Sequence, residues 1–185
     1  MDTLDFMPDS LEVFRAASTA DLAAVVELAA LTFPYSAPAG SDPANINFHI
    51  ANFLNAERFA EYIAQESAHL SLAEIDGALR GYSLLLVQQP QDPDVRKAVL
   101  ANPTAELSKC YVHPEEHGSG LAARLMVRNL EIAKAEGAAT VWLGVSSVNE
   151  RAKRFYQKQG FRSVGKKYFM FGGEQERDDV LEVVL

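Results

Sequence analysis

The chain has 185 residues, of which 48% are hydrophobic and 23% are charged, as is usual for one globular domain. Seventeen basic and 25 acidic residues give a net charge of −8, which disfavours a nucleic-acid partner and an anionic membrane surface. No apolar run reaches the roughly 18 residues of a membrane-spanning helix, and the acidic start is unlike a signal peptide. A single cysteine, Cys110, excludes an intrachain disulfide, so we expect a protein of the reducing cytoplasm.

The first third of the chain predicts one strand and three helices. Ser18-Thr-Ala-Asp21 has the pattern of a capping box, and apolar residues then follow at helical spacing as far as Phe33. Residues 46–54 fit a strand or a helix, and the Asp-Pro pair at 42–43 favours a helix because proline suits a first turn. The expected order is a loose leader over 1–11, a strand over 13–17, a helix over 18–33, a loop over 34–43, a helix over 46–54 and a helix over 55–63 capped by Asn55.

The remainder predicts strands and helices that complete a single domain over 12–185. Asp76-Gly77 is a hairpin turn between two strands, and the polar segment 88–102 holds one helical turn near 95–100. Gly172-Gly173 interrupts the chain before the final strand. The expected order is strands over 69–75, 79–87 and 107–112, a helix from the glycine-rich turn to Gly137, a strand over 140–145, a helix over 149–159, and strands over 161–171 and 180–185.

One stretch, from Glu106 to Met126, contains the most informative turn. After its strand and a tight acidic turn over 114–116, a helix opens with His117-Gly118-Ser119-Gly120-Leu121-Ala122. Glycines at a helix start let backbone N–H groups approach an anion closely, and the helix dipole favours negative charge there, so a phosphate-bearing ligand fits. The sequence contains neither the nucleotide-triphosphate P-loop nor the dinucleotide fingerprint, and a plain helix start explains this turn equally well by itself.

A second stretch follows the strand over 141–145 and reads Asn149-Glu-Arg-Ala152-Lys-Arg-Phe155-Tyr156-Gln-Lys-Gln-Gly160-Phe161. Together the two stretches resemble the GNAT family of acyl-CoA N-acetyltransferases. The family signature is R/Q-x-x-G-x-G/A after a strand and, further on, N-x-x-A-x-x-F-Y-x-x-x-G-F. The second motif is matched throughout, and the first is matched at Gly120 and Ala122. His117 stands where arginine or glutamine is usual, which leaves the backbone turn intact and puts the side-chain role of residue 117 in question.

The resemblance implies the GNAT fold, a mixed and mostly antiparallel α/β sheet flanked by helices and splayed between the strands at 107–112 and 141–145. It implies that acetyl-CoA is the cosubstrate, that no metal is needed and that an amine attacks the thioester directly. Glu106 would match the general base and Tyr156 the general acid, and the segment 88–102 would lie close to the site. The cofactor-binding residues would be Cys110, Tyr111, Val112, His117, Gly118, Ser119, Gly120, Leu121, Ala122, Asn149 and Phe155.

Within the family, the segments over 142–145 and 43–55, with Gly165 and Phe169, resemble PaiA-type polyamine acetyltransferases. This resemblance implies spermidine or spermine as the acceptor, and an acidic chain suits a polycation. Two alternatives stay open. One is a different amine, such as a protein N-terminus, an amino acid or an aminoglycoside, and the other is a catalytically inactive acyl-CoA-binding module. The expected partner is a small-molecule amine, with a homodimer as an open alternative.

Simpler explanations exist for several of these residues. Glu106 could be a solvent-facing glutamate on an edge strand, and Tyr156 a core aromatic on an amphipathic helix. Cys110 is expected to pack as a small hydrophobe, and Lys166-Lys167 to lie on a solvated strand edge. His113 and His117 are four residues apart, but the intervening proline breaks a helical pairing and no further cysteine or histidine cluster exists, so a metal site is not expected.

Overall fold

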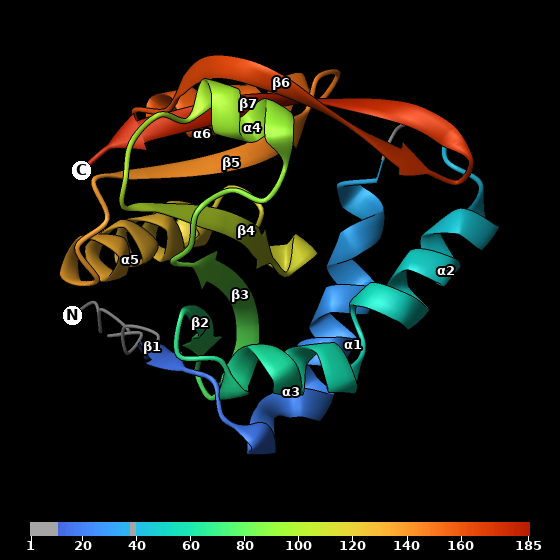
Figure 1. Cartoon of the computed structure of the whole chain (residues 1–185). Coiled ribbons are helices and arrows are strands. Elements are labelled where there is room, and N and C mark those ends of the chain that lie inside the picture. The colour runs from blue at the N-terminus through green and yellow to red at the C-terminus, as the bar shows by residue number, and fades with distance from the viewer. Residues whose placement is uncertain (1–10, 38–39) are drawn as a thin grey trace, which may run out of the picture.

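The structure, a computed structural model, describes residues 11–37 and 40–185. A seven-stranded sheet runs through the described chain in the order β1-β2-β3-β4-β5-β7-β6, with helices on both faces (Figure 1). The strands are β1 (Glu12–Ala16), β2 (Ala68–Ile75), β3 (Ala78–Leu86), β4 (Thr104–Val112), β5 (Thr140–Ser146), β6 (Arg162–Phe171) and β7 (Glu174–Val184). The helices are α1 (Leu22–Thr32), α2 (Pro43–Phe53), α3 (Ala56–Ala64), α4 (Pro93–Ala98), α5 (Leu121–Ala135) and α6 (Glu150–Lys158), with 3-10 turns η1 (Thr19–Asp21), η2 (Phe33–Tyr35) and η3 (Pro114–Glu116).

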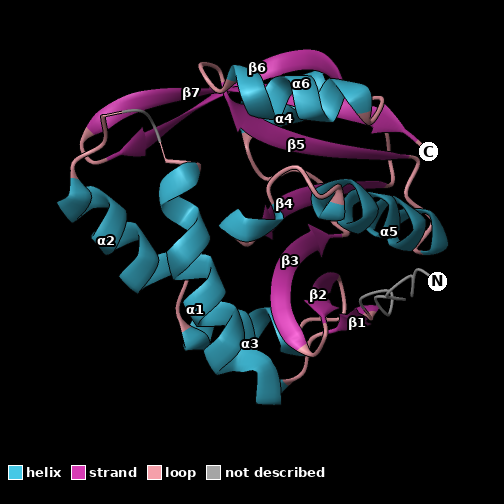
Figure 2. Cartoon of the chain, turned by 180° about the vertical axis from the view of Figure 1, so that it is seen from behind, coloured by secondary structure: helices cyan, strands magenta, loops and turns pink. Residues whose placement is uncertain are grey.

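Two groups of helices cover the two faces of the sheet (Figure 2). Helices α5 and α6 cover one face, where Met126 and Phe155 pack in the same cluster as Leu143 of β5. On the other face α1 and α3 cover β2 and β3, where Phe59 packs with Leu84, and α4 covers β5 and β7. All strand pairs are antiparallel except that of β4 and β5. The predicted fold class, a mostly antiparallel sheet flanked by helices, is therefore confirmed.

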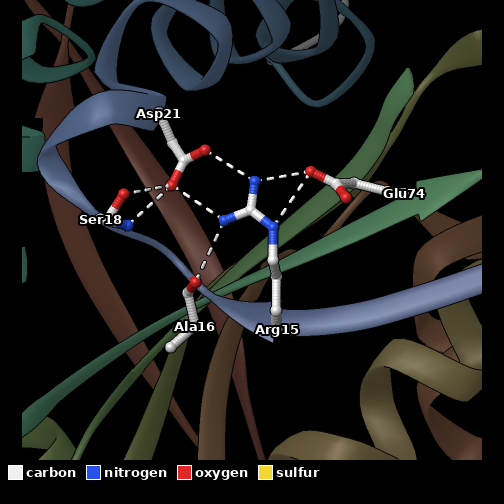
Figure 3. Close-up of polar contacts among 5 residues, drawn as sticks. All are labelled: Arg15, Ala16, Ser18, Asp21 and Glu74. Carbon is white, nitrogen blue, oxygen red and sulfur yellow. Dashed lines mark hydrogen bonds and ion pairs between the residues drawn. The ribbon is translucent and has the colours of Figure 1, made fainter. Parts of the chain in front are cut away.

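An arginine on β1 connects three elements at the start of the sheet (Figure 3). The Arg15 guanidinium donates to both carboxylate oxygens of Asp21, at 2.9 and 2.7 Å, and to Glu74 Oε1 of β2 at 2.6 Å. Asp21 Oδ2 also accepts from the N–H and the hydroxyl of Ser18, at 2.8 and 2.9 Å, which confirms the expected helix start. The guanidinium beside Asp21 holds the pKa of that carboxyl well below its usual range.

Two further helix starts form as the side chains before them predict. Asp42 Oδ1 accepts from the Ala44 N–H at 2.8 Å, with Pro43 in the first turn, and α2 is a helix rather than a strand. Asn55 Oδ1 accepts from the Arg58 N–H at 3.0 Å and starts α3. Because the first N–H groups of a helix lack intrahelical partners, these caps decide where each helix begins.

The end of the chain differs from the sequence-based expectation. β7 begins at Glu174 rather than at Val180, because the charged stretch before Val180 pairs with β6 and, from Asp178 on, with β5. This part of the hairpin extends past the helix-covered core, so its side chains show no apolar alternation. Gly172 and Gly173 form the tight turn between β6 and β7 instead of an interruption.

Two other expectations concern the segment 88–102 and the start of the chain. α4 packs Val95 against Val180 of β7, and no residue of 88–102 lines the cavity described below. Val180 pairs with Gly144, which does line the cavity, so the segment lies beside the cavity, as expected, without forming its wall. The leader expected over 1–11 lies, apart from Leu11, outside the described residues.

The two central strands β4 and β5 part shortly after they begin. Thr104–Glu106 pair with Thr140–Trp142, and no later residues of the two strands pair. On its other side β4 stays paired with β3 as far as Val112, with a bulge at Ser108. Within the described chain, the β5-facing backbone of β4 therefore has no strand partner after Glu106, which confirms the predicted splay.

Candidate active site

A cavity of about 720 Å³ opens where β4 and β5 diverge. β4 and the end of β5 form its walls, the starts of α5 and α6 close one end, and η2, α2 and the β6–β7 hairpin close the other. We name its two ends by their residues. The glycine-turn end is formed by His117, Gly118, Gly120, Ala122, Asn149, Arg151, Phe155 and Tyr156, and the hairpin end by Phe33, His49, Glu106, Lys109, Lys167, Phe171 and Asp178.

The turn before α5 leaves backbone N–H groups free. Gly120 is the N-cap of the helix, with φ of 84°, and Gly118 has φ of 92°, values that residues with a side chain rarely adopt. The Leu121 N–H donates to Ser119 Oγ at 3.2 Å. The N–H groups of Gly118, Gly120 and Ala122 donate to no acceptor in the described residues. Free N–H groups at the start of a fifteen-residue helix form a favourable site for an anion.

The six residues predicted at this turn do not all face the cavity. His117, Gly118, Gly120 and Ala122 line it, and Ser119 and Leu121 do not. Leu121 is fully buried in a hydrophobic cluster against α5 and the sheet. Its side chain therefore anchors the first turn of the helix, and only its backbone belongs to the glycine turn.

The His117 side chain does not supply the positive charge of the arginine that the family motif usually has there. Partial desolvation, together with the positive charge of Arg151, lowers the pKa of His117, so its imidazole is neutral at pH 7. Its ring lies edge-on to Tyr35, with centroids 5.7 Å apart. Arg151 on α6 also lines the cavity and is the cation at this end, a residue that the motif comparison missed.

The start of α6 contributes three predicted residues to the cavity. Asn149 Oδ1 accepts from the Ala152 N–H at 3.0 Å and caps the helix while also lining the cavity. Phe155 and Tyr156 line it as well, with their ring centroids 5.2 Å apart. Burial raises the pKa of Tyr156 above its usual value, so its phenol stays protonated across the physiological range.

Glu106 lies in the middle of the sheet, because it pairs with Leu86 on one side and with Trp142 on the other. The interpretation of Glu106 as a solvent-facing residue of an edge strand is therefore wrong. Its side chain lines the hairpin end of the cavity. Burial raises the pKa of this carboxyl, and the positive charges of Lys167 and Lys109 offset part of that rise. A carboxylate with a raised pKa is a better proton acceptor than an exposed one.

The three predicted residues at the end of β4 all line the cavity. Burial raises the pKa of Cys110 to about 12, so it carries a thiol rather than a thiolate, as expected of a packed residue. The Tyr111 hydroxyl accepts a hydrogen bond from Ser36 Oγ at 3.4 Å. Val112 packs with Leu121 and so joins β4 to the start of α5.

Three charged residues of the hairpin end were not found by motif comparison. Lys109 lies on β4, and Lys167 Nζ lies 3.7 Å from Asp178 Oδ2 on the neighbouring strand. Both lysines of the 166–167 pair lie on β6, the edge strand, as expected. Lys166 is exposed, whereas the Lys167 side chain is only partly exposed and lines the cavity. The alternation of a strand could have separated the two lysines, because successive side chains point to opposite faces.

Aromatic rings from three elements form one wall of the hairpin end. The rings of Phe33 and His49 stack with centroids 4.2 Å apart and planes 3° apart, and Phe171 lies 5.9 Å from His49. The hairpin tip is seated on α2, since a β carbon at Gly172 would collide with the Asn45 side chain (Figure 1). Sequence patterns could not reveal this wall, because its members are distant in the chain.

The described residues contain neither a cluster of metal ligands nor a helix suited to a membrane. Among residues 11–37 and 40–185, no group of three or more histidine, cysteine, aspartate or glutamate side chains is placed to hold a metal ion. In the same residues, no helix combines the length and the apolar character that crossing a membrane requires.

Comparison with known proteins identifies the family. The model of the acetyltransferase (GNAT) family matches residues 22–161. An uncharacterised N-acetyltransferase of Mycobacterium tuberculosis is 41% identical over 165 residues, which cover 87% of this chain and 94% of the relative. The fold is that of an acyltransferase. More specifically, the chain belongs to the GNAT family and is an N-acetyltransferase.

Solved structures share the fold over nearly the whole chain. The PaiA N-acetyltransferase of Thermoplasma acidophilum, in complex with coenzyme A, superposes with a TM-score of 0.76 at 20% identity, covering 95% of this chain and 99% of that one. The ribosomal-protein-S18-alanine N-acetyltransferase of Escherichia coli superposes with a TM-score of 0.68 at 17% identity, covering 94% of each chain. At 20% and 17% sequence identity, these similarities show a shared fold. A polyamine acceptor therefore stays a prediction.

Proposed function

We propose that the protein transfers the acetyl group of acetyl-CoA to a primary amine, which attacks the thioester carbon directly. The observation that carries this proposal is one cavity that contains both the free N–H groups of the glycine turn and the side chains of Glu106 and Tyr156. Holding two reactants in line supplies much of the acceleration in such a reaction and needs no enzyme nucleophile. The protonated thiol of Cys110 is consistent with that scheme.

The cosubstrate would lie along the gap between β4 and β5. Its pyrophosphate would accept hydrogen bonds from the N–H groups of Gly118, Gly120 and Ala122, where the helix dipole favours negative charge. Its pantetheine arm would pair with the free backbone of β4, from Leu107 to Val112, as an added strand does. Arg151 would add a positive charge near the phosphates.

Glu106 would act as the general base. An acceptor amine is protonated at pH 7 and must lose that proton before its nitrogen can attack. A carboxyl of ordinary pKa, about 4.3, is a weak base for an ammonium, and the burial of Glu106 reduces the mismatch by raising its pKa. The proton passes from the amine to Glu106, directly or through one water.

Tyr156 would act as the general acid. Attack by the amine places negative charge on the thioester oxygen, which a backbone N–H of the parted β4 can stabilise. The carbon–sulfur bond then breaks, and the Tyr156 phenol gives its proton to the departing thiolate. Because burial raises the pKa of Tyr156, the phenol is protonated when the thiolate forms, and it is a weaker acid than an exposed tyrosine.

The acceptor would enter at the hairpin end, which is lined by the proposed base. A polyamine is the acceptor implied by the PaiA-type resemblance, and the carboxyls of Glu106, Glu176 and Asp178 along the cavity support it. The ammonium groups of Lys109 and Lys167 in the same lining repel a polycation and weigh against it.

The proposal is tested with purified protein, acetyl-CoA and a panel of primary amines that includes spermidine, amino acids, an aminoglycoside and a short peptide. We expect CoA release that depends on the amine, with the acetylated amine identified by mass spectrometry. Calorimetry with CoA gives cosubstrate binding separately. Tight binding of CoA without acetylation of any amine would support the alternative, an inactive acyl-CoA-binding module, and contradict the proposal.

A further inference from the structure

Among the described residues, the ammonium group of Lys109 has no ion-pair partner. Its side chain is largely buried in the wall of the cavity. Within residues 11–37 and 40–185 its Nζ forms no ion pair and no hydrogen bond, and lies 5.5 Å from the centre of the Tyr62 ring. A buried ammonium is costly unless it is paired, so an anion that enters the cavity would supply the missing partner.

Two lysines with a carboxylate neighbour differ from Lys109 in this respect. Lys167 in the same cavity has Asp178 as a neighbour at 3.7 Å, and Lys97 on the surface has Asp94 at 3.1 Å. Burial lowers the pKa of Lys109, and the negative charge of Glu106 raises it in part. The other titratable side chains that face Lys109 are His49, whose pKa it lowers, and Tyr62. None of these forms an ion pair with it.

Glu106 and Lys109 lie on the same face of β4. Glu106 pairs with Leu86 of β3 and Lys109 pairs with Leu84, and these two leucines lie on the same face of β3. The two β4 residues are three positions apart rather than two because of the bulge at Ser108. Positions two apart on a strand are separated by roughly 7 Å, so both side chains can reach one small molecule. A ligand with an amine at Glu106 thus has its next few atoms near Lys109.

We propose that the acceptor is an α-amino acid whose carboxylate is bound by Lys109. This inference rests on the proposed acetyl transfer and names the substrate class of that site. The amine lies at Glu106, and the side chain of the amino acid lies against the rings of Phe33, His49 and Phe171, which favours an apolar or aromatic side chain. A polyamine has no anion for Lys109.

The test compares amino acids with the amines that differ from them by the carboxylate alone. Phenylalanine is paired with phenethylamine and methionine with 3-(methylthio)propylamine, and spermidine is added as the polycation. For wild-type protein at saturating acetyl-CoA we expect kcat/KM to favour each amino acid by roughly ten- to a hundredfold, as a charge-assisted hydrogen bond gives. Lys109→Met, which keeps the length and removes the charge, should abolish the preference by raising KM for the amino acids.

Lys166→Met is the matched control, because Lys166 is exposed and does not line the cavity. It should keep the preference of the wild type. The inference is overturned if wild-type protein uses phenethylamine or spermidine as well as phenylalanine, or if Lys109→Met lowers both members of a pair equally. Acetylation of amines without a carboxylate preference removes this inference alone, whereas CoA binding without acetylation of any amine removes the proposed function and this inference together.

Discussion

Gly144 of β5 lies against the side chain of Lys167, which reaches it from β6. A β carbon at residue 144 would stand 2.6 Å from Lys167 Cε and 2.9 Å from Asp178 Oδ2. β7 lies between β5 and β6 in the sheet, so Lys167 extends over a neighbouring strand before it reaches Gly144. The position of the Lys167–Asp178 pair at the hairpin end of the cavity therefore depends on a residue without a side chain.

Gly144→Ala should displace that pair and weaken acceptor binding. The displaced atoms are the ends of flexible side chains, so the free energy of unfolding should fall by less than about 1 kcal/mol. The KM for the acceptor should rise roughly tenfold, since a charged contact is worth about that much, while CoA affinity stays unchanged. Steady-state kinetics and calorimetry check this. An unchanged acceptor KM would show that the pair plays no part in binding.

Tyr156→Phe should lower kcat and leave CoA affinity unchanged. The substitution removes one hydroxyl and keeps the ring packing against Phe155 and Phe161. General acid catalysis is typically worth about 10²- to 10⁴-fold, and a thiolate leaves readily, so we expect the low end of that range. The measurement is kcat at saturating acetyl-CoA and amine. A Phe variant with wild-type kcat and a lower melting temperature would make Tyr156 a structural residue.

Glu106→Gln should remove the acidic limb of the pH–rate profile. The base acts in its deprotonated form, and burial raises its pKa, so wild-type kcat/KM should fall as the pH drops through that raised value. The variant should lose about 10²- to 10⁴-fold in kcat/KM. The pH dependence of stability has the opposite direction from that of activity. Because the folded-state pKa is raised, Glu106 costs no stability below the ordinary glutamate pKa, where it is protonated, and destabilises the folded protein above the raised pKa, where it is ionised. At pH 8 the glutamine variant should therefore be at least as stable as the wild type.

Gly120→Leu should raise the CoA dissociation constant at least tenfold. A side chain there would stand where phosphate oxygens approach the free N–H groups, and its β carbon would lie 3.0 Å from Arg124 Nη1. The positive φ adds a backbone cost of about 1 kcal/mol. Gly137→Leu is the matched control, because Gly137 also has positive φ, of 78°, but lies beyond the far end of α5. Calorimetry with CoA on both variants, showing equal affinities, would remove the phosphate site.

Asp21→Asn should destabilise the protein by about 1 to 2 kcal/mol at pH 7. Charge-assisted hydrogen bonds set this magnitude, reduced because the Arg15 side chain is 37% exposed and screened by solvent. The folded pKa of Asp21 is depressed, so its contribution is present above the unfolded pKa near 3.9 and is lost as the pH falls below that value.

Urea unfolding of wild type and variant between pH 7 and pH 3 checks the Asp21 prediction. The difference in unfolding free energy should shrink below about pH 4. Arg15→Met and the double variant complete a cycle that isolates the pair. A difference that stays constant with pH would mean that Asp21 stabilises the helix start without its charge.

Local signals predict most of the helices and strands. Asp42 and Asn55 predicted two helix starts because a side-chain cap acts within three residues. The glycine turn and the motif around Tyr156 predicted the glycine-turn end of the cavity, because both depend on residues close together in the chain. The strand over 174–179 was missed because a hairpin that leaves the core needs hydrogen bonds rather than an apolar pattern.

The tertiary structure decided the acceptor end of the site. Whether Glu106 faces solvent or a cavity depends on which strands flank β4, and the pairing with Leu86 and Trp142 follows from contacts across the sheet. Within residues 11–37 and 40–185 Lys109 has no ion pair, whereas Lys167 lies 3.7 Å from Asp178 across the hairpin. A sequence determines caps, turns and motifs, whose partners are neighbours in the chain. Burial and charge pairing arise between distant segments, and only the packing of the fold determines them.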